Sequence, residues 1–239
     1  MTRPLMALLT TALVAFGSAT QAATFVAGKH YSVLPQAQRT SVAPGKVEVM
    51  EVFSYGCPAC NHFRPTMKKL KAALPANAQL VYLPAAWHVE ENWPVFQRAF
   101  ITAQMLGIAD KAHDALFDAI WTTGELAILE KDQQRVKSKL PSIDDIARFY
   151  QRVTGTKAAD FVNASKSFSV DLKARQADSQ IIAMQVSGTP TLVVNGKYRV
   201  NNDAFEKNDD IIDLVKFLVA KERPTAAAPA AVAPAVKKS

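Results

Sequence analysis

The chain has 239 residues, of which 49% are hydrophobic and 21% charged, and its formal net charge is +7. This length is enough for one domain with a sizeable core. The basic residues are scattered along the chain and form no cluster interleaved with aromatic residues, which argues against a polyanion-binding role. We therefore expect no nucleic-acid partner and interpret the positive charge as a solvated surface.

The N-terminal segment has the features of a secretory signal. Arg3 supplies a positive charge, residues 5–17 are mostly apolar, and small residues follow. We predict a signal peptide over residues 1–22, with cleavage after Ala22; cleavage after Ala19 or Ala23 is the alternative. The apolar run is shorter than the roughly 20 residues that a membrane-spanning helix needs. Export would place the mature protein in an oxidising compartment, where disulfides persist.

Two strands are predicted before the first helix. Residues 29–34 form a short edge strand, and residues 47–53 form a central strand because that run is apolar and β-branched, as in a strand covered on both faces. Glu51 is the exception in the second run, and it stands shortly before the first cysteine. A carboxyl group is costly to bury without a partner. We therefore take Glu51 as a candidate site residue.

The only two cysteines, Cys57 and Cys60, stand where this strand ends and a helix begins. The helix is predicted over residues 57–74, with Pro58 in its first turn, where a missing N–H matters least. Unpaired N–H groups and the helix dipole would stabilise a thiolate at Cys57. Cys60 lies one turn further on the same face. The pair can therefore alternate between dithiol and disulfide.

A structural disulfide and a structural zinc site are weaker hypotheses for this cysteine pair. A disulfide across four residues would close a very small loop and would restrain the unfolded chain little. A structural zinc site needs four ligands, and the four histidines of the chain show no metal-like spacing. The C-x-x-C spacing at a strand–helix junction therefore favours redox chemistry, with no metal.

The rest of the chain predicts a strand, a long helical stretch and a closing hairpin. A strand is predicted over residues 79–83, and Asn195-Gly196 is a two-residue turn between strands at 191–194 and 197–200. Residues 124–140 show no clear pattern. Helices are predicted over 92–106, 110–122, from 141 onward, 158–164, 168–184 and 209–221. The long helix at 168–184 has three expected core positions, Leu172, Ile181 and Ile182.

This order of elements predicts one α/β domain. We place it at residues 23–223, as a mixed sheet interrupted by a helical insertion at about 92–186. The tail over residues 224–239 is rich in Ala and Pro and should be extended and disordered.

The motif Cys57-Pro58-Ala59-Cys60, followed much later by Gly188-Thr189-Pro190 before an Asn-Gly hairpin, resembles the thioredoxin superfamily. The helical insertion, with the run from Glu51 to Pro58, is similar in particular to the DsbA-like periplasmic thiol–disulfide oxidoreductases. This resemblance covers about residues 45–220. It implies a thioredoxin-like mixed sheet with a helical insertion, and a location in the periplasm.

The resemblance also implies a role for each site residue. Cys57 would be an exposed nucleophile of low pKa, and Cys60 would be the buried resolving thiol. Glu51 would be a buried acid of raised pKa that moves a proton for Cys60. Thr189-Pro190 would be a cis peptide that offers main-chain groups to an extended substrate in an apolar groove. No cofactor is expected beyond the redox-active Cys57–Cys60 disulfide, whose motif Pro58 and Ala59 complete.

One position departs from the family pattern. The strongest oxidases of the family carry His between the cysteines, where this chain has Ala59. Because a cationic His would help to hold the thiolate, Ala59 predicts a less oxidising pair. Nearby, His62 is expected on the helix surface, and Tyr55, Trp87 and Trp93 are expected in the core.

The leading hypothesis is disulfide donation to unfolded exported proteins through a mixed disulfide, with reoxidation by a DsbB-type membrane partner. A disulfide isomerase or reductase is the second hypothesis, although such isomerases carry an N-terminal dimerisation domain for which this chain has little room. A non-catalytic peptide-binding chaperone module and a metal carrier using Cys57, Cys60 and His62 are the others. We expect a monomer, because no coiled-coil or dimerisation segment is visible.

Overall fold

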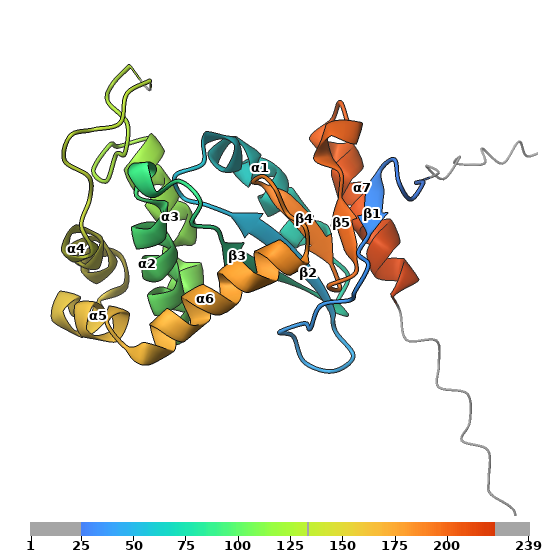
Figure 1. The fold of residues 1–239 in the computed structure, drawn as a ribbon, viewed down its shortest axis with the longest axis horizontal. Helices are drawn as coiled ribbons and strands as arrows, with labels where there is room; N and C mark the ends of the chain where they lie inside the picture. Colours follow the sequence, from blue (N-terminus) through green and yellow to red (C-terminus); the bar gives the residue numbers. More distant parts are fainter. Residues whose placement is uncertain (1–24, 133, 223–239) are drawn as a thin grey trace, which may run out of the picture.

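The computed structural model describes residues 25–132 and 134–222. The predicted signal peptide (1–22) and the Ala/Pro-rich tail (224–239) lie outside these residues, so both stay predictions. Within the described ranges, no helix combines the length and the apolar character needed to cross a membrane. This part of the chain forms one sheet flanked by helices (Figure 1).

A mixed sheet of five strands forms the centre of the fold, in the order β1-β5-β4-β2-β3. Strand β2 is parallel to β3 and antiparallel to β4, whereas β5 is antiparallel to both β4 and β1. The mixed sheet expected from the sequence is therefore confirmed. The strands are β1 (Tyr31–Val33), β2 (Val47–Phe53), β3 (Ala78–Pro84), β4 (Thr191–Val194) and β5 (Tyr198–Val200).

Strand β2 is buried along its whole length because it lies between β3 and β4 and is covered on both faces. Its bounds match the predicted 47–53. Glu51 is buried as expected, but Glu48 is buried as well. The central strand thus carries two buried acids where the sequence pattern singled out one. The two side chains point to opposite faces of the sheet, because they stand three residues apart on a strand.

Seven α-helices occur among the described residues. Helices α1 and α7 pack together on one face of the sheet, where Phe63 and Leu218 join Val49 in one apolar cluster. Helices α2 to α6 lie between β3 and β4 in the chain and build the other, larger cluster. The helices are α1 (Pro58–Ala73), α2 (Trp93–Met105), α3 (Ala109–Trp121), α4 (Ile143–Thr154), α5 (Ala158–Ser165), α6 (Phe168–Ala183) and α7 (Asn208–Lys221), with short 3₁₀ segments at Val89–Glu91 and Asn202–Ala204.

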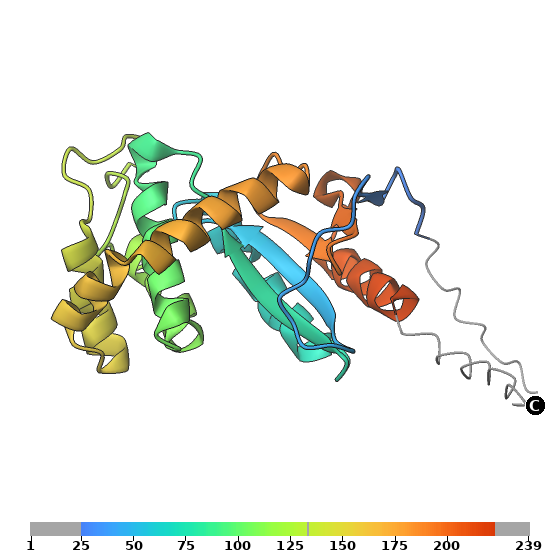
Figure 2. The same cartoon turned by 60° about the horizontal axis from the view of Figure 1, so that its bottom comes forward.

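Helix α6 crosses the surface from α5 back to the sheet (Figure 2). The prediction of Leu172 and Ile182 as core positions is wrong, because these side chains are 40% and 75% exposed. Ile181 is buried as predicted, together with Val170 and Ala177. The helix buries only this narrow stripe because it lies on the outside of the fold, and the sequence offered apolar residues on more than one of its faces.

The hairpin predicted from the sequence is confirmed in detail. Asn195 and Gly196 both have positive φ, as a tight two-residue hairpin between β4 and β5 requires. Ser142 caps α4 in a full capping box with Asp145. The described residues of the segment 124–140, all but residue 133, include no helix or extended strand, yet Leu126 and Ile128 are buried against the helical cluster.

Candidate active site

The two cysteines lie at the carboxyl end of β2, where the chain enters α1. Cys57 is the N-cap residue of α1, with extended backbone at φ −84° and ψ 116°, and Pro58 opens the helix. The Cys60 main-chain N–H donates to Cys57 Sγ at 3.4 Å. Both thiols are free. A main-chain N–H that has no partner within the helix therefore donates to Cys57 Sγ, as the sequence predicted.

Cys57 is the thiol of lowered pKa. A hydrogen bond from the Cys60 side chain is the largest influence, and it lowers the pKa of Cys57 to about 6. Burial acts in the opposite direction, whereas contacts with Thr189 and with main-chain N–H groups lower the pKa further. The Cys57 thiol also lies 3.4 Å from the Thr189 carbonyl oxygen. The residue is 6% exposed, so the expectation of an exposed nucleophile is wrong. The chain around Thr189 closes over the sulfur.

Cys60 has the opposite environment. It is 1% exposed, and burial, followed by the neighbouring Cys57, raises its pKa well above the usual range. Cys57 therefore ionises first, while Cys60 keeps its proton. This asymmetry gives the two sulfurs different chemistry, one as attacking or leaving thiolate and the other as a retained thiol.

Glu51 lies under the dithiol on β2, paired with Tyr82 of β3 and Leu192 of β4. It is 3% exposed. Burial, and then the negative charge of Cys57, raises its pKa to about 8, and Glu51 in turn raises the pKa of Cys60. The predicted burial and raised pKa are thus confirmed. A carboxyl group in this state can hold a proton at neutral pH and exchange it.

The peptide bond between Thr189 and Pro190 is cis, as expected. The loop that carries it connects α6 to β4, and Asn202 donates a hydrogen bond to the Pro190 carbonyl at 2.8 Å. A cavity of about 480 Å³ lies beside this loop and beside Ala59. The apolar groove expected here is not what this cavity offers, because its lining is largely polar: Ser187, Thr189, Thr191, Arg199, Asn201, Asn202 and Asp203.

The residues just before Cys57 are tightly enclosed. A Cβ atom on Gly56 would lie 2.4 Å from Trp93 Nε1, so no side chain fits there without moving the indole. Trp93 is buried, as predicted, and it donates a hydrogen bond to Glu91 at 3.1 Å. The prediction that Trp87 is a core residue is wrong, since it is 39% exposed, with its ring beside that of Trp93.

Helix α3 holds the loop between β2 and α1, a contact that the sequence pattern did not reveal. Trp121 Nε1 donates to the Tyr55 carbonyl oxygen at 2.8 Å, and His113 Nδ1 lies 2.9 Å from the Tyr55 hydroxyl. Burial lowers the pKa of His113 to about 4, so it is neutral at pH 7. One signal was present: His113 shares a helical face with Leu116 and Phe117, a pattern typical of a buried position.

The ligand atoms of Cys57, Cys60 and His62 do not converge into a metal-binding group in the described part of the chain. The one group of three that comes close enough there is His88, Glu90 and Glu91, which is largely exposed. His62 lies on the surface of α1, as predicted.

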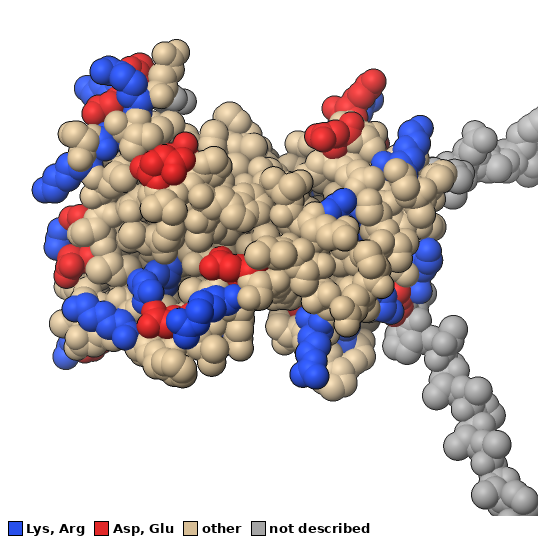
Figure 3. Space-filling view, in the orientation of Figure 1, with Lys and Arg blue, Asp and Glu red and all other residues tan. Residues whose placement is uncertain are grey.

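Charged side chains are mixed on the surface. Lys and Arg alternate with Asp and Glu on the face shown in Figure 3, which carries no continuous basic patch. Several charges pair directly, as Arg64 with Asp118 at 2.8 Å and Arg98 with Asp171 at 2.6 Å. This mixing agrees with a solvated surface.

An asymmetric dithiol at a helix N-terminus, beside a cis-proline loop and above a buried acid, is the arrangement of the thioredoxin-fold thiol–disulfide oxidoreductases. Residues 74–213 match the family model described as "DSBA-like thioredoxin domain". The chain belongs to this family. The matched residues begin after the redox motif, so the motif and the family match are independent of each other.

Curated relatives and solved structures agree with this assignment. The chain is 34% identical over 223 residues to the thiol:disulfide interchange protein DsbA of Pseudomonas aeruginosa, covering 92% of this chain and 98% of the relative. A crystal structure of a variant of that DsbA matches with a TM-score of 0.71 and 32% identity, over 84% of this chain and 99% of the other. The oxidoreductase DsbA of Xylella fastidiosa matches with a TM-score of 0.71 and 29% identity, over 83% and 97%. The protein is a thiol–disulfide oxidoreductase.

Proposed function

We propose that the oxidised Cys57–Cys60 pair donates its disulfide to exported proteins that are still unfolded. The observation that supports this direction is the unequal stabilisation of the two sulfurs. A Cys57 pKa of about 6 makes the reduced pair a stable thiolate–thiol at neutral pH. Stabilising the reduced form makes the disulfide a stronger oxidant.

The reaction proceeds in two exchanges. A client thiolate attacks the Cys57 sulfur, a client–Cys57 bond forms, the Cys57–Cys60 bond breaks, and Cys60 leaves and takes up a proton. A second client thiolate then attacks the client sulfur of this mixed disulfide. The client disulfide forms and Cys57 leaves as a thiolate, which its lowered pKa favours. Two electrons pass from the client to the protein.

Glu51 supplies the proton for Cys60 in the first exchange. Burial is the larger cause of its raised pKa and does not depend on the Cys57 thiolate, so Glu51 still holds a proton when Cys57 is bonded to the client. Cys60 is too buried to remain a thiolate, because burial raises its pKa. The carboxyl group then regains its proton from solvent. Thr189, whose carbonyl oxygen lies 3.4 Å from Cys57 Sγ, would meet the client main chain beside the cis Pro190.

The cellular setting is also part of the proposal. The signal-like residues 1–22 and the DsbA relatives support export to the periplasm. The reduced pair would return its two electrons to a DsbB-type membrane partner. We propose that the protein works as a monomer, with no cofactor besides its own disulfide.

A stoichiometric oxidation assay tests the proposed direction. The oxidised protein is mixed anaerobically with a short reduced peptide that carries two cysteines, quenched with acid, and analysed by mass. We expect one peptide disulfide for each protein disulfide consumed. A Cys60→Ser variant given the oxidised peptide should keep it as a mixed disulfide on Cys57, while the matched Cys57→Ser variant should not. If the reduced peptide remains reduced, disulfide donation is wrong.

A further inference from the structure

The outer edge of β3 is a part of the fold that the dithiol chemistry leaves unused. Just beyond the two ends of this strand, the Asn77 carbonyl oxygen accepts a hydrogen bond from β2 at 2.8 Å and the Ala85 N–H donates one to β2 at 2.7 Å. Main-chain groups of alternate residues point to opposite sides of a strand. The N–H and C=O groups of Leu80 and Tyr82 therefore point away from β2, along the free edge of the sheet.

Strand β3 is the last strand of the sheet, and no strand pairs with its outer edge among the described residues. Throughout residues 25–132 and 134–222, neither Leu80 nor Tyr82 has a main-chain hydrogen bond to a partner outside the β2–β3 ladder. Natural sheets commonly protect such an edge with charged residues, bulges or a covering segment. Here the strand reads Leu-Val-Tyr-Leu without a charge until Pro84, whose carbonyl oxygen is occupied by Gln97 at 3.1 Å. Two residues thus present four unused main-chain groups.

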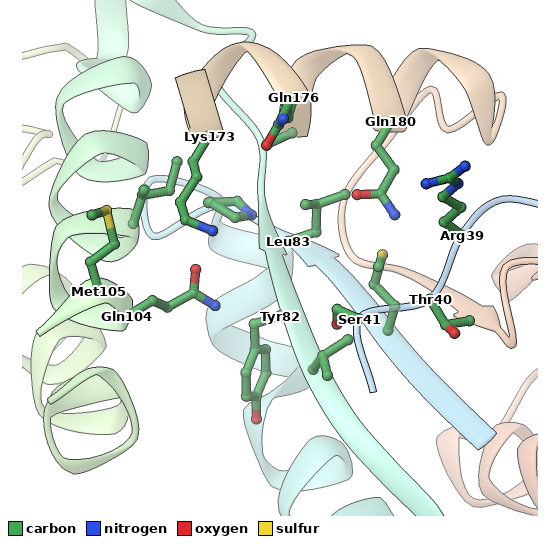
Figure 4. Close-up of a pocket in the computed structure, with 15 residues that line it drawn as sticks. Arg39, Thr40, Ser41, Tyr82, Leu83, Gln104, Met105, Lys173, Gln176 and Gln180 are labelled. Carbon is green, nitrogen blue, oxygen red and sulfur yellow. The ribbon is translucent and has the colours of Figure 1, made fainter. Parts of the chain in front are cut away.

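A cavity of about 470 Å³ lies beside this edge, on the face of the sheet opposite α1. Figure 4 shows it between β3, the end of α2, helix α6 and the segment that carries Arg39. Its apolar surface comes from Met50, Val81, Leu83, Ile101 and Met105. Three side-chain amides reach it from the helices, those of Gln104, Gln176 and Gln180. Side-chain amides beside an apolar surface suit a polypeptide ligand, because a polypeptide carries both hydrogen-bonding main-chain groups and apolar side chains.

The charges around the cavity have one sign. Lys173 and Arg39 line it at two places (Figure 4), and no Asp or Glu is among its lining residues. This is unlike the cavity beside Pro190, whose lining includes Asp203. A ligand with apolar and acidic side chains fits this environment best.

We propose that an extended segment of an unfolded client adds to β3 as a further strand and places one row of its side chains, those of every second residue, in this cavity, and that this row carries both apolar and acidic groups. This choice of occupant rests on the proposed function, because an unfolded client offers main-chain N–H and C=O groups that have no hydrogen-bond partner. Strand addition binds through main-chain hydrogen bonds, and pockets for alternate side chains give preference. A client held here while its thiol meets Cys57 gains from two weak contacts in one chain.

The test uses the full oxidised chain, labelled with ¹⁵N, and a cysteine-free Val/Glu peptide with blocked ends. In this peptide Thr occupies every second position and Val and Glu alternate at the others, so that one row of side chains carries both groups. We expect saturable shifts of the Leu80 and Tyr82 amide signals. The same peptide methylated on alternate main-chain nitrogens should not bind, because it cannot pair along the edge. The proposal is overturned if the first peptide does not bind, if its shifts map elsewhere, or if the methylated peptide binds equally well.

A charge reversal tests the chemistry of the occupant. Lys173→Glu should weaken binding of the Val/Glu peptide about fivefold, the size expected for one partly exposed charge contact. Lys68→Glu, an equivalent reversal at an exposed position of α1 away from the cavity, should leave the affinity unchanged. Equal affinities in the two variants would overturn the assignment to acidic clients.

This test is independent of disulfide donation. Lys173→Glu should oxidise a short two-cysteine peptide at the unchanged rate, because such a peptide is too short to reach β3 while it reacts. Loss of that oxidation in the unmodified protein would refute the proposed function, whereas loss of Val/Glu peptide binding would refute only the β3 site.

Discussion

The two buried acids of β2 have the same side chain and nearly the same exposure, 1% for Glu48 and 3% for Glu51, but different surroundings. Glu48 accepts hydrogen bonds from the Ser41 N–H at 2.6 Å and the Ser41 hydroxyl at 2.7 Å. Glu51 instead lies next to a thiol pair, where burial and the charge of Cys57 both raise its pKa. One carboxyl group fastens a loop, and the other is kept protonated.

This difference shows that burial alone does not mark a reactive acid. A carboxyl group that is buried beside a negative charge is driven to the neutral form, as at Glu51. Glu51 can therefore provide a proton at neutral pH, whereas the hydrogen bonds from Ser41 give Glu48 a structural role. The comparison therefore separates the structural end of β2 from its redox end.

The largest effect is expected at the redox end, from Cys57→Ser. Disulfide exchange should fall to the uncatalysed background, because the remaining Cys60 is buried and its pKa is raised. The measurement is the rate of oxidation of a two-cysteine peptide. The variant also lacks the thiolate that raises the pKa of Glu51, so the Glu51 pKa should fall below about 8. Exchange at an undiminished rate would show that Cys57 is not the attacked sulfur.

The next effect separates the two acids through the pH dependence of stability. Between pH 4.5 and about 8, the unfolded chain has ionised Glu51 while the folded chain still holds its proton. The free energy of unfolding should therefore fall as the pH rises through this window. Glu51→Gln removes this fall and should stabilise the protein at pH 7 by about 2 to 4 kcal/mol.

Glu48→Gln is the matched control. It weakens the bonds from Ser41 and should destabilise the protein by about 1 to 3 kcal/mol, without slowing peptide oxidation. Urea unfolding at several pH values measures both variants. If Glu51→Gln also destabilises the protein at pH 7, the buried carboxyl is not held neutral and its comparison with Glu48 fails.

Crowding before Cys57 should have a smaller effect on stability. A methyl group at Gly56 must displace the Trp93 indole, since its Cβ would lie 2.4 Å from Nε1. Gly56→Ala should therefore cost about 1 to 3 kcal/mol of unfolding free energy and slow disulfide exchange. Gly188→Ala, on the other side of the dithiol, has nothing within 4 Å of the added carbon and should be near neutral for stability. Equal losses in the two variants would contradict the close packing of Trp93.

The smallest effect is expected from Ala59→His. Ala59 is exposed beside the thiols, so a cationic His there should stabilise the Cys57 thiolate further. We expect the potential of the pair to rise by about 30 mV, equal to about tenfold in the equilibrium constant with glutathione. Ala59→Gln, which adds bulk without charge, should change it little. The same potential in all three proteins would remove the argument from the missing histidine.

The sequence predicts the redox end of β2 well because its signals are local. The strand pattern of 47–53, the cysteine spacing and the first-turn Pro58 all lie within one short segment. The resemblance to the DsbA-like family then supplies the distant partner Pro190. Both the fold class and the positions of these residues agree with the structure.

The contacts that the sequence could not predict depend on how distant elements pack. His113 meets Tyr55 only because α3 lies against the loop before Cys57. The role of Glu48 depends on Ser41 folding back onto β2. Exposed apolar residues on α6, such as Ile182, follow from its place outside the fold, which periodicity does not reveal. A sequence pattern gives the face of an element but not what covers it.

The measurement that tests the central claim most directly is the redox potential of the Cys57–Cys60 pair, obtained by equilibration in glutathione buffers and trapping of the thiols. The unequal environments of the two sulfurs predict an oxidising pair, between about −180 mV and the value of about −120 mV known for a DsbA. A value near about −270 mV, like that of thioredoxin, would show that the lowered pKa of Cys57 does not make the pair a disulfide donor.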